Sequence, residues 1–266
     1  MTRSQPTFRA CQDGNTGSGS NRSEISGGHT SLENGLTAAQ LEQLRAIDTC
    51  TVSNVIESFG VRVRNEGFAD SSVRSVFTHF PPMVGYAVTA RIRTAPTPTL
   101  VHNYFDRTDW WNHLLTVPEP RVIVVQDIDE QPGLGALLGE VHTNILHALG
   151  CVGAVTNGAV RDLPAVEAIG FHLYAGHVAV SHAYAHIVDF GSPVEVGGLT
   201  VRAGDLIHGD RHGILSIPLE IAAEIPAVAA RILEMEKRIV SLCRSPQFSL
   251  EKLRALLKEL TEPERN

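Results

Sequence analysis

The stretch that most constrains the fold of this chain is residues 133–162, GLGALLGEVHTNILHALGCVGAVTNGAVRD. A helix that begins near Glu140 and ends at Gly150 separates two apolar runs, RVIVVQD at 121–127 and CVGAV at 151–155. This order predicts a strand, a crossover helix and a second strand. Such units are parallel and right-handed, so the loops that follow the two strands emerge at the same edge of the sheet.

The polar residues of this unit are therefore expected to lie close together. A turn at Asn157-Gly158 leads to Arg161 and Asp162, while Glu140 opens the helix after a Gly-rich loop. Open α/β sheets usually bind ligands in the crevice at this edge. A helix N-terminus, two carboxylates and one guanidinium suit a small oxo acid held beside a divalent metal.

Composition excludes several classes of protein. With 266 residues, 43% of them hydrophobic, the chain can bury a substantial core. The net charge of -7 comes without a basic patch, so no nucleic-acid partner is expected. The four cysteines show no paired spacing, and no apolar run approaches the roughly 20 residues of a membrane span. We expect reduced thiols, no membrane contact and a cytoplasmic location.

Three regions are predicted along the chain: a disordered tail over 1–35, a catalytic domain over 36–218 and C-terminal helices over 219–266. The tail is polar and Gly/Ser-rich and cannot repay the entropy of ordering. Helices are predicted at 37–46 and at 51–59, and the second has Asp48 or Thr49 as its cap and Gly60 as its stop. A strand at 83–94 and a helical segment around Trp110-Trp111 follow. After the central unit we predict a short helix from Leu163-Pro164, short β segments from Phe171 to Pro218, and helices at 219–243 and 249–260.

The placement of lysines argues for metal chemistry. All three, Lys237, Lys252 and Lys258, lie in the predicted C-terminal helices, so a buried Schiff-base lysine is not expected. A carbonyl-active enzyme would then need a metal as electron sink, and Mg²⁺ or Mn²⁺ prefers carboxylate and water oxygens. Asp162 and Glu140 fit that requirement.

Simpler alternatives exist for these and other residues. Arg161 and Asp162 could form a surface turn, with Glu140 a favourable first-turn acid. GLGALLG lacks the glycine spacing of a dinucleotide loop. The segment with His172, His177, His182, Tyr184 and His186 could form a zinc site, or could line a subunit contact or the mouth of the pocket. Turn chemistry explains Asp205 and Asp210, and packing explains Trp110-Trp111.

Two segments carry a resemblance to a known family. They are GEVHTNILHALGCVGAVTNGAVRD at 139–162 and GGLTVRAGDLIHGDRHGILSIP at 197–218. Together with TCTVSNVIESFG and VGYAVTARIRT, they resemble the 4-hydroxy-4-methyl-2-oxoglutarate aldolase family, which includes the regulator of ribonuclease activity A (RraA). The likeness covers about Leu36 to Pro218, and its motif is an acid followed twenty-one residues later by Arg-Asp.

The resemblance implies a swivelling β/β/α fold with N- and C-terminal helices, assembled as a homotrimer or homohexamer with sites between subunits. It also implies a class II pyruvate aldolase that depends on Mg²⁺ or Mn²⁺ and cleaves a 4-hydroxy-2-oxo diacid, with oxaloacetate decarboxylation as a related activity. By position, Asp162 would bind the metal. Substrate contacts would come from Gly139, Glu140, Val141, His142 and Arg161, with Arg161, Asp162 and Glu140 catalytic.

One departure from the family pattern matters. The aldolases usually have Asp where this chain has Glu140, whose carboxylate is one methylene further from the backbone. The family also draws an acid from a neighbouring subunit, for which Glu220 and Glu224 are weak candidates. The main alternative is a non-catalytic RraA-type regulator that binds a ribonuclease or another protein. A methyltransferase function lacks an adenosylmethionine loop.

Overall fold

The computed structural model describes residues 35–96 and 107–261. The predicted tail over 1–35 lies outside the described residues except for Gly35. The described residues belong to one compact unit. In the described residues no helix is long and apolar enough to span a bilayer. The described cysteines, Cys50, Cys151 and Cys243, are all free thiols.

The two N-terminal helices are both capped, and α2 has the predicted cap at Asp48 and the predicted stop at Gly60. In α1 (Ala38–Arg45) the cap residue Thr37 and Gln40 form a reciprocal capping box. In α2 (Thr49–Phe59) the Asp48 side chain accepts a hydrogen bond from the backbone N–H of Thr51. Gly60 ends α2 with a φ of 65°, a left-handed conformation that glycine adopts without steric cost.

Four parallel strands form the centre of the main sheet: β2 (Met83–Arg93), β3 (Arg121–Asp127), β5 (Cys151–Val160) and β6 (His172–Val178). The order across the sheet is β1-β6-β5-β3-β2-β10-β11, and the β3-to-β5 pairing confirms the predicted parallel unit. The other strands are β1 (Arg74–Ser75), β4 (Ala136–Leu138), β7 (His186–Phe190), β8 (Val194–Val196), β9 (Leu199–Val201), β10 (Leu206–Asp210) and β11 (Gly213–Ile217).

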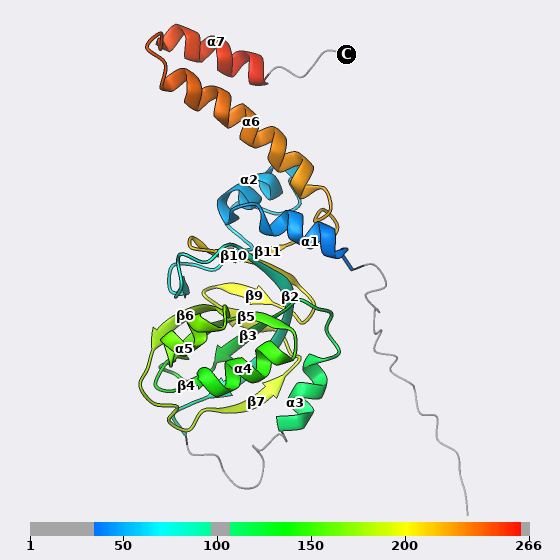
Figure 1. The fold of residues 1–266 in the computed structure, drawn as a ribbon, viewed down its shortest axis with the longest axis vertical. Helices are drawn as coiled ribbons and strands as arrows, with labels where there is room; N and C mark the ends of the chain where they lie inside the picture. Colours follow the sequence, from blue (N-terminus) through cyan, green and yellow to red (C-terminus); the bar gives the residue numbers. More distant parts are fainter. Residues whose placement is uncertain (1–34, 97–106, 262–266) are drawn as a thin grey trace, which may run out of the picture. The chain divides into compact units, whose positions relative to one another are not determined.

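Two hydrophobic clusters cover the two faces of this sheet. Along β2, Val84 and Val88 belong to one cluster, whereas Met83 and Ala87 belong to the other. The first cluster includes residues of α1, α2, α4 (Glu140–Ala148) and α5 (Leu163–Ala168). The second includes β8 and β9, which form a separate antiparallel pair. The result is a mixed α/β layered domain with a nearly closed sheet and terminal helices, as expected (Figure 1).

The predicted turn at Asn157-Gly158 is wrong, because β5 continues through it to Val160. The pairing of β5 with β6 shifts register between Thr156 and Ala159. At this bulge the Asn157 side chain replaces backbone groups of β5 in pairing with Asp127, the last residue of β3. Its Oδ1 accepts a hydrogen bond from the Asp127 N–H at 2.8 Å, and its Nδ2 donates to the Asp127 carbonyl at 2.9 Å. The amide satisfies the backbone groups that a paired strand would otherwise satisfy.

Two other boundaries differ from the predictions. The segment 177–188 was expected to be one β run, but residues 179–185 lie outside β6 and β7. The first C-terminal helix was expected from residue 219, but α6 (Ile225–Cys243) begins six residues later. Pro226 stands in its first turn, where the missing N–H costs no helical hydrogen bond.

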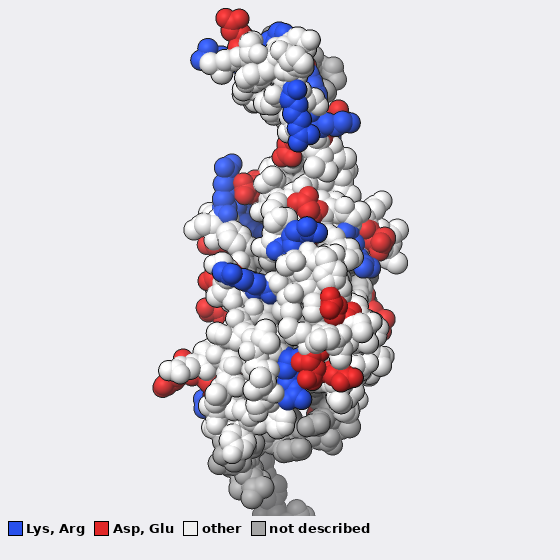
Figure 2. Space-filling view, turned by 60° about the vertical axis from the view of Figure 1, so that its left-hand side comes forward, with Lys and Arg blue, Asp and Glu red and all other residues white. Residues whose placement is uncertain are grey.

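The C-terminal helices extend from the sheet domain. α6 packs against α2, and α7 (Leu250–Thr261) packs back along α6 (Figure 1). An ion pair between Arg238 and Glu259, 2.7 Å apart, joins the two helices. On the face that Figure 2 shows, acidic and basic side chains are interspersed rather than gathered into one patch.

Candidate functional site

A cavity of about 450 Å³ opens beside the predicted site residues. It lies between the start of α4, the segment that follows β5, the segment that precedes β7, and the helix α3 (Arg107–Leu114). Its described lining residues are Trp110, Trp111, Ala136, Leu137, Gly139, Val141, His142, Ile145, Arg161, Asp162, His182, Ala183, Tyr184, Ala185, His186 and Ile187. Of the predicted site residues, Gly139, Val141, His142, Arg161 and Asp162 are in this lining, and Glu140 is not.

Strand β4, which the sequence analysis did not predict, explains why these residues meet. It pairs in parallel with the end of β5, and Leu138 lies opposite Val160. The Arg161 N–H continues this ladder by donating to the Leu138 carbonyl at 3.0 Å. Gly139 and Arg161 are thus neighbours across two paired strands, which positions them more rigidly than two facing loops would.

Asp162 has an unusual backbone conformation. Its φ of 55° is left-handed, which is uncommon for a residue other than glycine. Asp162 stands at the N-cap of α5 but makes no side-chain cap to that helix. Instead its Oδ2 accepts hydrogen bonds from the Glu140 N–H at 3.1 Å and from Arg161 Nε at 3.2 Å. Its carboxylate therefore caps α4, whose own N-cap residue, Gly139, has no side chain.

These contacts keep Asp162 ionised. The hydrogen bond from the Glu140 N–H, followed by the one from Arg161, lowers the pKa of the Asp162 carboxyl below its ordinary value. The partial positive charge at the start of α4 acts in the same direction. Asp162 is thus a carboxylate at neutral pH, half-exposed beside the cavity.

Gly139 is the residue that allows this approach. A Cβ built on Gly139 would lie 2.6 Å from Asp162 Oδ2 and 3.0 Å from Arg161 Cγ. Any side chain at position 139 would push the carboxylate away from the Glu140 N–H. The glycine is required here for close packing rather than for backbone conformation, because its φ of -141° is open to any residue.

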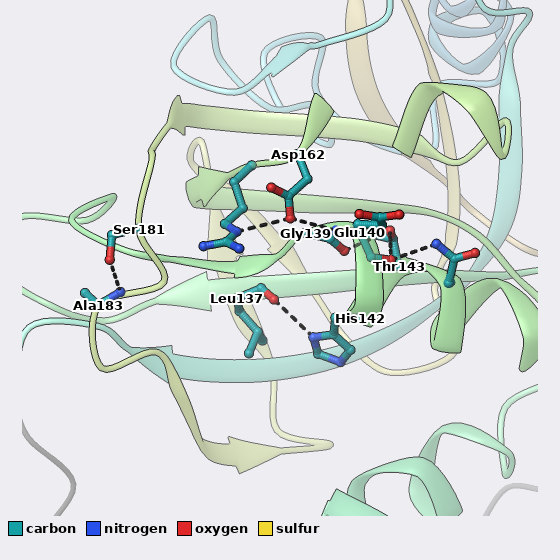
Figure 3. A network of polar contacts seen from close by, with 10 residues as sticks. Leu137, Gly139, Glu140, His142, Thr143, Asp162, Ser181 and Ala183 are labelled. Carbon is teal, nitrogen blue, oxygen red and sulfur yellow. Dashed lines mark hydrogen bonds and ion pairs between the residues drawn. The ribbon is translucent and has the colours of Figure 1, made fainter. Parts of the chain in front are cut away.

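Glu140 takes part through its backbone. Its side chain is exposed and is not among the residues that line the cavity. Figure 3 shows the side chains of Glu140 and His142 leaving the first turn of α4 in different directions, with the Asp162 carboxylate above the helix start. His142 faces the cavity, and its Nδ1 lies 3.2 Å from the Leu137 carbonyl.

Sequence reasoning did not place the aromatic wall of the cavity. Trp110 and Trp111 were predicted to be packing residues within a helical segment, and α3 confirms the helix. Trp110 does pack, since it is 2% exposed and its ring centroid lies 5.8 Å from that of Phe190. Both tryptophans are nevertheless among the residues that border the cavity, and Trp111 is the more exposed of the two. Tertiary contacts bring α3 to this wall, and no spacing in the sequence signals it.

The histidines do not form the zinc site that was considered. His182 lies in the irregular segment before β7, and His186 begins that strand. Both line the cavity, as the pocket-mouth alternative expected. His172, by contrast, is buried, and burial lowers its pKa to about 4. Within residues 35–96 and 107–261, no group of three His, Cys, Asp or Glu side chains could hold a metal.

A divalent cation can still be accommodated at Asp162. Mg²⁺ commonly takes one or two protein carboxylates and completes its shell with water and substrate. Asp162 Oδ2 is used by Glu140 and Arg161, and no described residue bonds Oδ1. An ionised carboxylate with one open oxygen at a cavity fits a hard cation.

A second polar cluster lies at the hairpin of β10 and β11. Asp205 accepts a hydrogen bond from the Arg202 N–H, in keeping with the turn chemistry expected there. Asp210 does more than form a turn, because its Oδ2 also accepts from the Thr49 N–H at 3.0 Å, which joins the start of α2 to the sheet. Next to it, His208 is completely buried.

Known proteins resemble this chain over part of its length. A protein of Halalkalibacterium halodurans named "Putative 4-hydroxy-4-methyl-2-oxoglutarate aldolase" is 33% identical over 84 residues, which is 31% of this chain and 40% of that protein. Protein MJ0644 of Methanocaldococcus jannaschii is 27% identical over 134 residues, 49% of this chain and 64% of that protein. The chain thus spans less than two thirds of the length of either relative.

Solved structures share the fold at low identity. A protein from Pseudomonas syringae pv. tomato superposes with a TM-score of 0.64 at 22% identity, covering 83% of this chain and 94% of that one. RraAS2 of Streptomyces coelicolor, described as an unusual member of the RNase ES inhibitor RraA protein family, gives a TM-score of 0.59 at 21% identity, with 76% and 96% covered. At these identities the likeness concerns the fold.

A family model also matches more than half of this chain. The RraA-like family model, described as Aldolase/RraA, matches residues 49–216, from the first residue of α2 to the last strand of the sheet. This range contains the cavity, the Arg161-Asp162 pair and all the strands described above. On this match the chain is a member of the RraA-like family.

Proposed function

We propose that this chain is a divalent-metal-dependent lyase that cleaves a 4-hydroxy-2-oxo acid to pyruvate, with oxaloacetate decarboxylation as a related activity. The observation that carries the proposal is the ionised Asp162 carboxylate, held by Arg161 and the start of α4 at the edge of a cavity. The relative named as an aldolase supports the reaction class. In the proposed enzyme the chains form a homotrimer or homohexamer.

Arg161 is the proposed anchor of the substrate. Its Nε is engaged with Asp162, and the described residues make no hydrogen bond to its two terminal nitrogens. These can pair with the carboxylate of a 2-oxo acid by two parallel, charge-assisted hydrogen bonds. The first turn of α4, over Gly139 to His142, adds backbone N–H groups and the positive end of the helix dipole.

Asp162 is the proposed metal ligand, through Oδ1. When bound, a divalent cation supplies Lewis acidity that stabilises negative charge on the 2-oxo oxygen as the carbon–carbon bond breaks. The protein orients the oxo acid between Arg161 and Asp162, which both border the cavity. His182 and His186 are within the same cavity and are proposed to accept the proton of the 4-hydroxyl, either directly or through water.

Glu140 is proposed to contribute through its backbone N–H and through its side-chain carboxylate, and the structure supports the first role more than the second. Its N–H fixes Asp162, which rests on the 3.1 Å contact. A catalytic role for its carboxylate, as holder of a metal-bound water, stays a prediction from the sequence, because that side chain does not line the cavity within one chain. Glu220 and Glu224, the candidates for an acid donated by a neighbouring subunit, are both exposed and stay predictions as well.

The test is pyruvate formation from 4-hydroxy-4-methyl-2-oxoglutarate and from oxaloacetate, coupled to lactate dehydrogenase, with Mg²⁺, with Mn²⁺ and with a chelator. Asp162→Ala is expected to lower kcat/KM at least about a hundredfold, because the metal loses its protein ligand. Glu251→Ala, an exposed carboxylate on α7, is the matched control and should keep full activity. Turnover that persists with the chelator, or in Asp162→Ala, contradicts the proposal.

A second candidate is a non-catalytic regulator that binds another protein. One observation favours it: three apolar side chains, Leu134, Val178 and Val180, are 60%, 63% and 100% exposed. Leu134 precedes β4, Val178 is the last residue of β6, and Val180 follows that strand. Such a surface is typical of a protein contact. Calorimetry with Mn²⁺ and pyruvate separates the candidates, since a regulator has no need to bind either.

A further inference from the structure

The cavity has two chemically different parts. Arg161 and Asp162 stand where it meets the first turn of α4, and Trp110, Trp111 and Ile187 form a wall contributed by α3 and β7. Along α4 the lining continues from Gly139 to Ile145, a rise of about 9 Å at 1.5 Å per residue. The cavity therefore extends well beyond the space that a pyruvate unit fills, and its 450 Å³ is in the size range of pockets for larger organic ligands.

Among the described residues, the apolar part offers no lysine or arginine to hold a second carboxylate. Among the described lining residues, Arg161 is the one lysine or arginine, and it is already paired with Asp162. The Nδ1 atoms of His182 and His186 lie 2.7 Å and 2.6 Å from backbone carbonyl oxygens. Both Nδ1 atoms are therefore engaged with the backbone and are not free to bind a carboxylate. A carboxylate placed against the indoles would lose its hydration without gaining a cation.

We propose that the substrate carries an aromatic group, rather than a carboxylate, on C4: a 4-aryl-4-hydroxy-2-oxobutanoate. This inference rests on the proposed lyase function and narrows its substrate class. The 2-oxo acid end lies at Arg161 and Asp162, and the aromatic ring lies against the partly exposed side chains of Trp111, Ile145 and Ile187. Aromatic rings gain from edge or offset contacts with indole in addition to the burial of their apolar area.

The reaction balances without a further reactant. The C3–C4 bond breaks, its electron pair stays on C3 to give the enolate of pyruvate, and the proton of the 4-hydroxyl leaves to a base. C4 becomes the carbonyl carbon of an aromatic aldehyde, and protonation of C3 yields pyruvate. In the reverse direction, pyruvate and an aromatic aldehyde combine to the same hydroxy acid.

The first test measures binding without turnover. The chain has two tryptophans, and both line the cavity, so its indole fluorescence reports occupancy directly. The probes are 4-phenyl-2-oxobutanoate and 2-oxoglutarate, which share the 2-oxo acid and a two-carbon spacer and differ in a terminal phenyl or carboxylate. With Mg²⁺ present, the phenyl compound should bind at least about tenfold more tightly and shift the emission. Equal or tighter binding of 2-oxoglutarate overturns the inference.

A variant tests which wall receives the remote end of the ligand. Ile145→Arg places a cation in the apolar part and should move the ratio of the two dissociation constants at least about tenfold toward 2-oxoglutarate. His147→Arg, on the same helix but exposed and outside the cavity, should leave the ratio unchanged. An unchanged ratio in folded Ile145→Arg overturns the placement. If that variant does not fold, the ranking in the unaltered protein decides.

Turnover distinguishes this inference from the function on which it rests. Pyruvate release from 4-hydroxy-2-oxo-4-phenylbutanoate and from 4-hydroxy-4-methyl-2-oxoglutarate is compared by chromatography with Mg²⁺ present. Faster cleavage of the phenyl acid supports both proposals. Faster cleavage of the diacid overturns the substrate class and leaves the lyase function standing. Cleavage of neither acid, with tight binding of the phenyl probe, overturns the lyase function and retains the aromatic ligand class.

Discussion

Two polar clusters of this protein use similar groups in opposite ways. The site cluster, Arg161, Asp162 and the Glu140 N–H, is half-exposed beside a cavity. The core cluster, Thr49, His208 and Asp210, is buried. In the core cluster His208 Nε2 lies 3.1 Å from the Ile47 carbonyl and its Nδ1 lies 3.1 Å from Thr49 Oγ1.

The two clusters differ in how many of their polar atoms have hydrogen-bond partners within the protein. Both ring nitrogens of His208 form hydrogen bonds within the protein, to Thr49 and to the Ile47 carbonyl. Both carboxylate oxygens of Asp210 accept hydrogen bonds, from Thr49 and His212. The site cluster leaves Asp162 Oδ1 without a described partner at a cavity. A buried network in which every polar atom is hydrogen-bonded stabilises one structure. A polar atom without a partner beside a cavity can instead bind a ligand.

The largest expected effect breaks the core cluster. His208→Ala removes the donor to the Ile47 carbonyl and the partner of Thr49 and leaves a cavity, so it should lower the free energy of unfolding by about 3 kcal/mol. Chemical denaturation measures this. Asp162→Asn should leave the unfolding midpoint close to that of the unaltered protein. A midpoint that falls as far in Asp162→Asn as in His208→Ala would remove the distinction between the clusters.

The next effect sharpens the geometry of the site cluster. Gly139→Ala should displace the Asp162 carboxylate and lower kcat/KM by about tenfold, or about 1.4 kcal/mol, with little loss of stability because the side chain can move. His147→Ala, exposed on the same helix, serves as the control. Unaltered kinetics in Gly139→Ala would show that the close approach of Asp162 to α4 has no catalytic importance.

Acidification should affect the buried histidines before it affects the site. Burial lowers the pKa of His208, and it lowers that of His172 to about 4, so the unfolded chain binds more protons than the native one below about pH 6.5. Stability is therefore complete above that pH and falls as the pH falls. From pH 7.5 to 5.5 the His172 contribution should cost about 1 kcal/mol. Thermal unfolding across this range, which should be flatter in His172→Gln, gives the measurement.

The smallest expected effect concerns Glu140. Glu140→Gln keeps the backbone N–H that binds Asp162 and changes only an exposed side chain, so kcat/KM should change less than about threefold. Steady-state kinetics at saturating metal decide this. A loss of tenfold or more would instead support the role that the family pattern implies for an acid at this position.

The strand-helix-strand unit was predictable because its signals are local. The apolar run of β3, the glycine after α4 and the caps of α1 and α2 are written in consecutive residues. The bulge at Asn157 was not predictable, because Asn-Gly is typical of a turn. Only the backbone of Asp127, thirty residues earlier, turns that asparagine into a ladder partner.

By itself the sequence determined the family, the parallel core of the sheet and the pairing of Arg161 with Asp162 near the start of α4, because periodicity, caps and spacing act over short distances. The tertiary structure decided that Glu140 meets Asp162 through its N–H while its side chain lies outside the cavity, and that Trp110 and Trp111 form the far wall. Those facts depend on the register of β4 against β5 and on the packing of α3. Contacts between distant segments set both, and no single stretch of residues encodes them.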